Sequence, residues 1–100
     1  MYNVHMNIRF LWDEGKSREN RKKHGVSFEE AVTIFQNFPL EIFFDPEHSK
    51  KEDRYVAVGF SSKGRILLVV HCENKSGTVI RIISARKATK KEISTAFGGH

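Results

Sequence analysis

Residues 54–85 read RYVAVGF-SSKG-RILLVVHCE-NKSG-TVIRIISA, and this stretch decides the fold. It contains three runs rich in Val, Ile and Leu, which are Arg54–Phe60, Arg65–Glu73 and Thr78–Ala85. β-Branched runs of this length are typical of strands, and short links that end in glycine favour tight antiparallel hairpins between them. The stretch therefore predicts three consecutive antiparallel strands.

Upstream of these strands, the sequence predicts a strand, two helices and another strand. The first helix is strongly charged and ends at Gly25, a residue suited to a left-handed cap. The second begins at Ser27, which forms a capping box with Glu30, and its apolar residues follow the i, i+3, i+4, i+7 spacing of a core-facing helix. The predicted ranges are Asn7–Trp12, Glu14–His24, Ser27 to the residue before Pro39, and Leu40–Phe44.

The chain ends in a third predicted helix, which begins with a second capping box, Thr89 with Glu92, and stops by Gly98. The predicted order is β-α-α-β-β-β-β-α, an α+β fold in which an antiparallel sheet packs against helices. A chain of 100 residues can bury one modest core. We therefore expect a single domain over residues 1–100, with residues 1–6 as a flexible extension.

The composition is that of a globular protein, with 39% hydrophobic and 29% charged residues. No apolar run approaches the roughly 20 residues needed to cross a bilayer, and the start lacks the order of a secretory signal, so we expect a cytoplasmic protein without membrane contact. Cys72 is the single cysteine, which excludes a disulfide framework and favours a small buried hydrophobe. Seventeen Lys and Arg against twelve Asp and Glu give a net charge of +5, which favours nucleic acid or an acidic protein as partner.

Three separated motifs, taken together, resemble the BrnT family of type II toxins. They are FLWDEGKSRENRKKHGVSFEEAVTIF, DPEHSKKEDRYVAVGFSSKGRILLVV and IRIISARKATKKE, and they cover residues 10–92 in the order of the family. The resemblance implies a fold similar to RelE-type toxins and an endoribonuclease activity that arrests translation and growth. It also implies neutralisation by a BrnA-like antitoxin in a hetero-oligomer, which would reach operator DNA only through the antitoxin.

The end of the chain departs from that family pattern. The family's last helix often reads ERRAYE, whereas this chain has EISTAF at residues 92–97, with Ala96 where a tyrosine is expected. This difference keeps an alternative open, in which the chain is a catalytically inactive module of the same fold that binds RNA or the antitoxin. This alternative predicts binding that weakens with salt and no cleavage product.

Regular hairpins with four-residue links predict which side chains share a face of the sheet. In that register Arg54 lies opposite His71, and His71 lies opposite Ile80. The resulting face is apolar with a basic pair at each end, and a bulge in either hairpin would change the assignment. The two basic pairs are Arg54 with His71 and Arg65 with Arg86, while Arg81 falls on the opposite face.

RNA carries its own nucleophile in the 2′-hydroxyl, so a basic site without a metal ion can cleave it. We expect Arg86, at the junction of the last strand and the final helix, to stabilise charge on the phosphate, with Lys87 adding a second charge. His71 is the predicted general base or acid, together with Arg54 in the catalytic site. The alternatives are a capping or surface role for Arg86 and a core position for His71.

The remaining candidate residues are predicted to bind substrate. Trp12 is suited to stacking a nucleobase, although a core anchor is the alternative. Lys23 belongs to a basic cluster on the first helix that tracks RNA, binds antitoxin carboxylates or forms a solvated face. His48 lies in a polar loop with Asp45 and Asp53, but that spacing is commonplace, so we expect neither a metal site nor a cofactor. The predicted substrate-binding set is Lys87, Arg65, Arg81, His48, Trp12 and Lys23.

Overall fold

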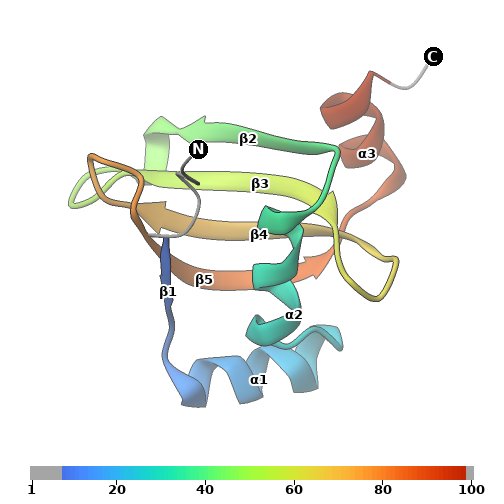
Figure 1. Cartoon of the computed structure of the whole chain (residues 1–100), viewed down its shortest axis with the longest axis horizontal. Coiled ribbons are helices and arrows are strands. Elements are labelled where there is room, and N and C mark those ends of the chain that lie inside the picture. Colours follow the sequence, from blue (N-terminus) through green and yellow to red (C-terminus); the bar gives the residue numbers. More distant parts are fainter. Residues whose placement is uncertain (1–7, 99–100) are drawn as a thin grey trace, which may run out of the picture.

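The computed structural model describes residues 8–98 and shows five strands in one sheet, with helices packed on it (Figure 1). The order of the strands is β1-β5-β4-β3-β2. The predicted extension over residues 1–6 lies outside the described residues. Among the described residues, no helix has the length and apolar character needed to cross a membrane.

The predicted α+β order is confirmed, with one difference in strand direction. Strand β1 runs parallel to β5, whereas the other three neighbouring pairs are antiparallel. No hairpin joins β1 to its neighbour, so turn geometry does not impose an antiparallel direction on it. The strands are β1 Arg9–Leu11, β2 Leu40–Asp45, β3 Arg54–Phe60, β4 Ile66–Glu73 and β5 Val79–Lys87, and the helices are α1 Glu14–His24, α2 Phe28–Val32 and α3 Lys90–Phe97, with 3₁₀ turns η2 Thr33–Gln36 and η3 Pro46–His48.

Helices α1 and α3 begin and end where their capping residues predict, whereas the second helix ends at Val32 and continues as the 3₁₀ turn η2 to Gln36, short of the predicted limit before Pro39. Gly25 ends α1 in the left-handed conformation at φ 71°, and α3 begins with the complete capping box of Thr89 and Glu92. The box predicted for α2 is only half formed. The Ser27 hydroxyl accepts a hydrogen bond from the Glu30 N–H at 3.1 Å. The Glu30 carboxylate binds Ser61 and Arg65 instead of accepting from the backbone N–H of Ser27.

The core lies on the face of the sheet covered by α1 and α2, which we call the inner face. Side chains from α2 and η2, including the fully buried Phe28 and Ile34, pack there against the three central strands. The sheet contributes Ala57, Leu67, Val69, Ile80, Ile82 and Ala85. The opposite face, which we call the outer face, carries the alternate residues of the same strands.

Helix α1 is attached to the sheet by polar side chains, because its sequence offers almost no apolar ones. The buried Asn20 side chain accepts the Ala85 N–H at 3.2 Å and donates to the Ala85 carbonyl at 2.7 Å and to the Val26 carbonyl at 2.8 Å. Its amide therefore bonds the backbone of β5 as a neighbouring strand would. The buried Ser17 hydroxyl adds a bond from the Phe28 N–H at 3.2 Å.

The predicted register of the first hairpin is wrong by one residue. Arg54 pairs with Cys72, and His71 pairs with Tyr55. The Ser61 N–H donates to the Arg65 carbonyl and Gly64 has φ 76°, so the loop has three residues and closes with a bulge at glycine. A one-residue slip moves side chains to the other face, which puts His71 on the inner face and leaves Arg54 on the outer one.

The second hairpin also differs from the prediction, because β5 contains a bulge. His71 pairs with Ile82 rather than Ile80, Val70 pairs with Ser84, and Ile83 between them is the extra residue. The bulge lets Ile82 and Ala85 both face the core although they are three residues apart. It also brings Arg81 to the outer face, the same face as Arg54 and Arg86, which corrects the predicted opposite placement of Arg81.

Candidate functional site

Three strands bring two arginines together around a cysteine on the outer face. Cys72 on β4 pairs with Arg54 on β3 and with Arg81 on β5. Cys72 is buried, as predicted, and the Arg81 Nη2 lies 3.9 Å from its Sγ. Arg81 is half-exposed and forms an ion pair with Glu52, whereas the buried Nε of Arg54 has no hydrogen-bond partner among the described residues. We call Arg54, Cys72 and Arg81 the Arg54 row. Within it the guanidinium of Arg81 is held in an ion pair, whereas that of Arg54 has no ion pair among the described residues.

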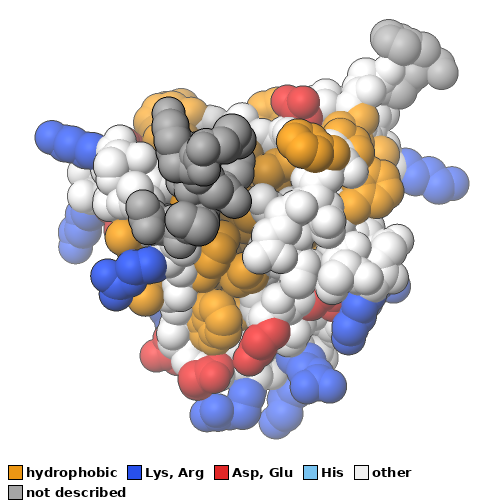
Figure 2. All heavy atoms as spheres, viewed as in Figure 1, with side chains coloured by type: hydrophobic (Ala, Val, Ile, Leu, Met, Phe, Trp, Pro, Cys, Tyr) orange, Lys and Arg blue, Asp and Glu red, His pale blue; other side chains and the backbone are white. Residues whose placement is uncertain are grey.

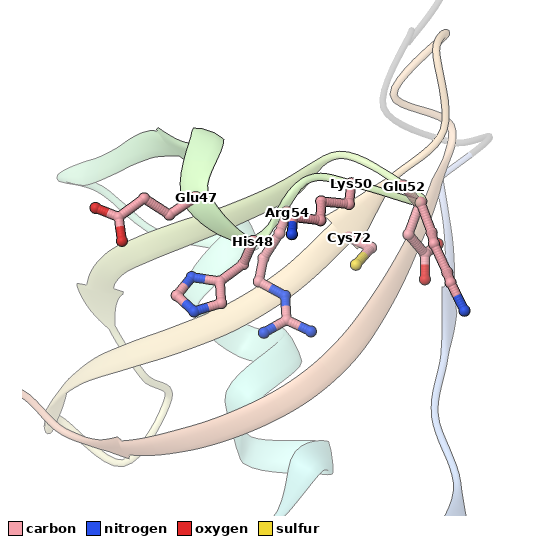
Figure 3. A pocket seen from close by; sticks show the side chains of 7 residues that line it. Glu47, His48, Lys50, Glu52, Arg54 and Cys72 are labelled. Carbon is pink, nitrogen blue, oxygen red and sulfur yellow. The ribbon is translucent and has the colours of Figure 1, made fainter.

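A hollow opens beside this row, between the strands and the loop that joins β2 to β3 (Figure 3). Four of its lining side chains are basic, namely His48, Lys50, Lys51 and Arg54. Figure 3 shows the guanidinium of Arg54 and the imidazole of His48 on the same side of the loop. Glu47, Glu52 and Cys72 complete the lining. The hollow is a mainly basic site that suits an anionic ligand.

His48 is held in place by the carboxylate that ends β2. Its Nδ1 lies 2.8 Å from Oδ2 of Asp45, and 60% of the side chain is exposed. A hydrogen bond to a carboxylate keeps the proton on Nδ1, so Nε2 of the neutral ring is left to accept a proton. An exposed imidazole oriented in this way can exchange a proton with a bound substrate.

Arg86 lies on the same outer face, near the other end of the sheet. It pairs with Leu68, four residues before Cys72 on β4, which places it about 13 Å along the strand from the Arg54 row. Its two Nη atoms bind the Glu92 carboxylate at 2.8 and 2.7 Å. This bidentate pair raises the pKa of Arg86 and lowers that of Glu92 to about 2. The predicted position at the strand-helix junction is observed, and Glu92 already binds the guanidinium.

His71 is part of the core rather than of this site. It is fully buried, between Tyr55 at a ring-centroid distance of 5.7 Å and Phe35 at 5.1 Å. Burial lowers the pKa of its imidazole, and the hydrogen bond from Nε2 to Glu73 at 2.8 Å opposes that effect. The sheet lies between His71 and Arg54, so the predicted pair of these two residues does not form.

The other predicted substrate-binding residues are dispersed. Arg65 lies on the inner side, where it forms an ion pair with Glu30 and donates to the Gly25 carbonyl, so the predicted pair of Arg65 with Arg86 does not form. Trp12 packs against the core and donates to Glu14 at 3.0 Å. Lys23 is exposed on α1, and Lys87 is exposed at the end of β5.

Three residues in or beside the hollow have roles that the sequence reasoning missed. Lys50 and Lys51 line it, and Asp45 orients His48. The signal for the lysines was present in the loop sequence DPEHSKKED, where two adjacent cations follow a histidine. Within residues 8–98, no three His, Cys, Asp or Glu side chains gather as metal ligands.

Comparisons with known proteins agree with this fold. A structure of the Brucella abortus ribonuclease toxin BrnT matches with a TM-score of 0.58 and 24% sequence identity, over 83% of this chain and 99% of that one. A search of curated proteins gives no match. A family model described as the ribonuclease toxin BrnT of type II toxin-antitoxin systems matches residues 12–92. Because that match spans most of the sequence, the chain belongs to the BrnT family of ribonuclease toxins of type II toxin-antitoxin systems.

Proposed function

We propose that this chain is itself an active endoribonuclease that cleaves RNA without a metal ion. The observation that carries the proposal is the hollow in which an imidazole, held by Asp45 at 2.8 Å, shares its lining with Arg54 and two lysines. These groups supply what transesterification of RNA needs, namely a proton acceptor and cations for the phosphate. Family membership supports RNA as the substrate class.

In the proposed reaction the 2′-oxygen attacks the adjacent phosphorus. The proton of the 2′-hydroxyl passes to Nε2 of His48, a 2′-O–P bond forms, and the bond from phosphorus to the 5′-oxygen breaks. The leaving oxygen takes a proton from solvent, and the first product is a 2′,3′-cyclic phosphate. Arg54 stabilises the charge that develops on the phosphoryl oxygens, because a guanidinium presents a fork of N–H donors that matches the oxygens of a phosphate.

The other basic residues of the outer face extend the proposed contact with RNA. Arg81 flanks the hollow, and Arg86 lies farther along the same face, where it would bind the RNA backbone away from the scissile phosphate. Lys87 pairs with Leu67 and so alternates to the inner side, at the end of β5. His71 takes no direct part, because it is fully buried on the other face. In this proposal the acid-base role predicted for His71 falls to His48.

The test compares two exposed histidines. Purified protein, free of antitoxin, is incubated with end-labelled single-stranded RNA and the matching DNA, with and without EDTA. We expect cleavage of RNA alone that survives EDTA and falls by about 10² to 10⁴ in His48→Gln, the range for loss of a general base. His24→Gln, an equally conservative change on α1, should retain full activity.

Arg54→Met and Arg86→Ala complete that experiment, with circular dichroism to confirm folding. Loss of cleavage in Arg54→Met places the scissile phosphate at the hollow, whereas a larger loss in Arg86→Ala would move it to the Arg86 end of the outer face. Equal activity of wild type and His48→Gln would refute the assignment of His48. Cleavage that requires a metal ion would refute the metal-free mechanism.

Membership of a type II system implies an antitoxin partner. We further propose that this antitoxin is BrnA-like, that it binds the chain in a hetero-oligomer, and that operator DNA is contacted through the antitoxin. Release of the chain in the cytoplasm would then arrest translation and growth. Co-expression with a BrnA-like protein tests this, because neutralisation should restore growth.

A second candidate function is a catalytically inactive module that binds RNA or the antitoxin. Two observations favour it, namely the absence of a tyrosine in α3, where Phe97 packs on Phe60 at 6.0 Å, and the occupation of Arg86 by Glu92. This module would bind RNA with an affinity that falls steeply with salt and would give no product. The cleavage assay separates the two candidates directly.

A further inference from the structure

The exposed large apolar side chains of this protein are concentrated around one strand. Phe38, Ile42, Phe43 and Phe44 are 94%, 42%, 40% and 52% exposed, and Leu11 is the single other such residue among those described. Three of them belong to β2, and Phe38 precedes it by two residues. Figure 2 shows apolar side chains over the part of the molecule where β2 lies, while Lys and Arg gather at the far end over α1. An apolar surface of this kind marks a site of protein interaction.

Strand β2 also has an unpaired edge. It is the outermost strand of the sheet and bonds only to β3 within residues 8–98, so its other row of N–H and C=O groups has no strand partner there. Natural edge strands are blocked by lysine, proline or bulges, and β2 has none of these between Leu40 and Asp45. An extended segment can therefore add to the sheet at this edge.

The charges around β2 have the opposite sign to those of the chain as a whole. Residues 38–49 contain Glu41, Asp45 and Glu47 but no Lys or Arg, although the net charge of the chain is +5. Asp45 is paired with His48, whereas Glu41 and Glu47 are exposed and have no ion pair among the described residues. Because Glu47 lines the hollow and Asp45 holds His48, Glu41 is the acidic side chain that β2 itself offers to a ligand at its edge.

We propose that β2 is the docking strand for an extended segment of a partner protein in which apolar residues alternate with Lys or Arg. The segment adds a sixth strand, with its apolar side chains beside Ile42 and Phe44 on the inner face and a cation beside Glu41 on the outer face. A second copy of the chain complements this surface less well, because it would bring another acidic strand to an acidic strand. The inference goes beyond RNA cleavage and does not rest on it.

The test measures binding of two fluorescent peptides to the full chain by anisotropy. The basic peptide has the sequence KVTVKVTV and the acidic one EVTVEVTV, which share apolar residues and differ only in charge. We expect the basic peptide to bind roughly tenfold more tightly. Glu41→Lys should reverse that preference, whereas Glu19→Lys, the same charge change on α1, should leave it intact. Ile42→Lys, which places a blocking lysine on the edge, should abolish binding of both peptides.

Several outcomes would overturn the proposal. Equal binding of the two peptides, or the same reversal in Glu19→Lys, would mean that β2 does not select its ligand by local charge. A wild-type dimer in sedimentation that Ile42→Lys dissociates would identify a second copy as the occupant. Binding that appears only after removal of residues 1–6 would identify that segment as the occupant. RNA cleavage is measured for every variant and should be unchanged, so failure of this inference stays distinct from failure of the proposed reaction.

Discussion

Replacement of Asn20 by leucine should detach α1 from the sheet, although leucine has a similar size and a better helix propensity. The Asn20 amide makes three hydrogen bonds, one from the Ala85 N–H and one each to the carbonyls of Ala85 and Val26. Leucine makes none of them, and the position is only 8% exposed, so water cannot easily replace the lost partners. At about 1 kcal/mol for each bond, the free energy of unfolding should fall by about 3 kcal/mol.

The assay is urea denaturation at constant pH, followed by circular dichroism and by the fluorescence of Trp12, the single tryptophan. A loss of about 3 kcal/mol corresponds to a decrease in Tm of roughly 12–24 °C for a chain of this size. Arg18→Ala is the matched control, because Arg18 is exposed on the same helix and its removal should change stability by no more than about 0.5 kcal/mol.

A loss below about 1 kcal/mol in Asn20→Leu would refute the reasoning, since it would mean that the amide does not hold the edge of β5. The alternative explanation, a general sensitivity of α1 to substitution, is separated by Arg18→Ala. A large loss in both variants would point to helix stability rather than to the hydrogen bonds of Asn20.

Three further predictions concern the core, an ion pair and a turn. Burial lowers the pKa of His71, so below about pH 6.5 the unfolded state binds a proton more readily than the folded state does. The free energy of unfolding should therefore fall as the pH drops from 7 to 5. Urea denaturation at each pH measures this dependence, which should be weaker in His71→Phe. Glu30→Gln should lower Tm in a thermal melt more than Glu29→Gln does. Glu30 is buried against Arg65 and Ser61, whereas Glu29 is exposed. Equal effects of the two changes would contradict a stabilising role for the ion pair of Glu30 with Arg65. Gly64→Ala should cost about 1–2 kcal/mol in chemical denaturation, since φ 76° is strained for alanine, and Lys63→Ala in the same turn should be nearly neutral.

Much of the local structure was predictable because it depends on residues close together in the chain. The bounds of α1 follow from a charged segment that ends at Gly25, and α3 begins where Thr89 and Glu92 form a capping box. Strand β3 occupies the predicted range Arg54–Phe60. In each case a side chain and a backbone group within a few residues satisfy each other, so neighbouring residues suffice to define the boundary.

Which side chains lie on the same face of the sheet was predictable only in part. Arg54 and Arg86 lie on the same face, as expected, but His71 lies on the other one and Arg81 joins the arginines. Side chains alternate along a strand, so a single extra residue in a turn or a bulge exchanges the faces of everything beyond it. The sequence does not distinguish a three-residue loop with glycine at φ 76° from a four-residue one.

By itself, the sequence determined the kind and order of the elements, because caps, glycines and apolar periodicity act over a few residues. Tertiary structure alone decided which side chains form the basic hollow, since that depends on the register that pairs Arg54 with Cys72 and on the loop that brings His48 beside Arg54. It also decided that the Asn20 side chain would bond the backbone of β5 at Ala85, which is 65 residues away in the sequence. Contacts at such separations depend on packing and register, which no local pattern encodes.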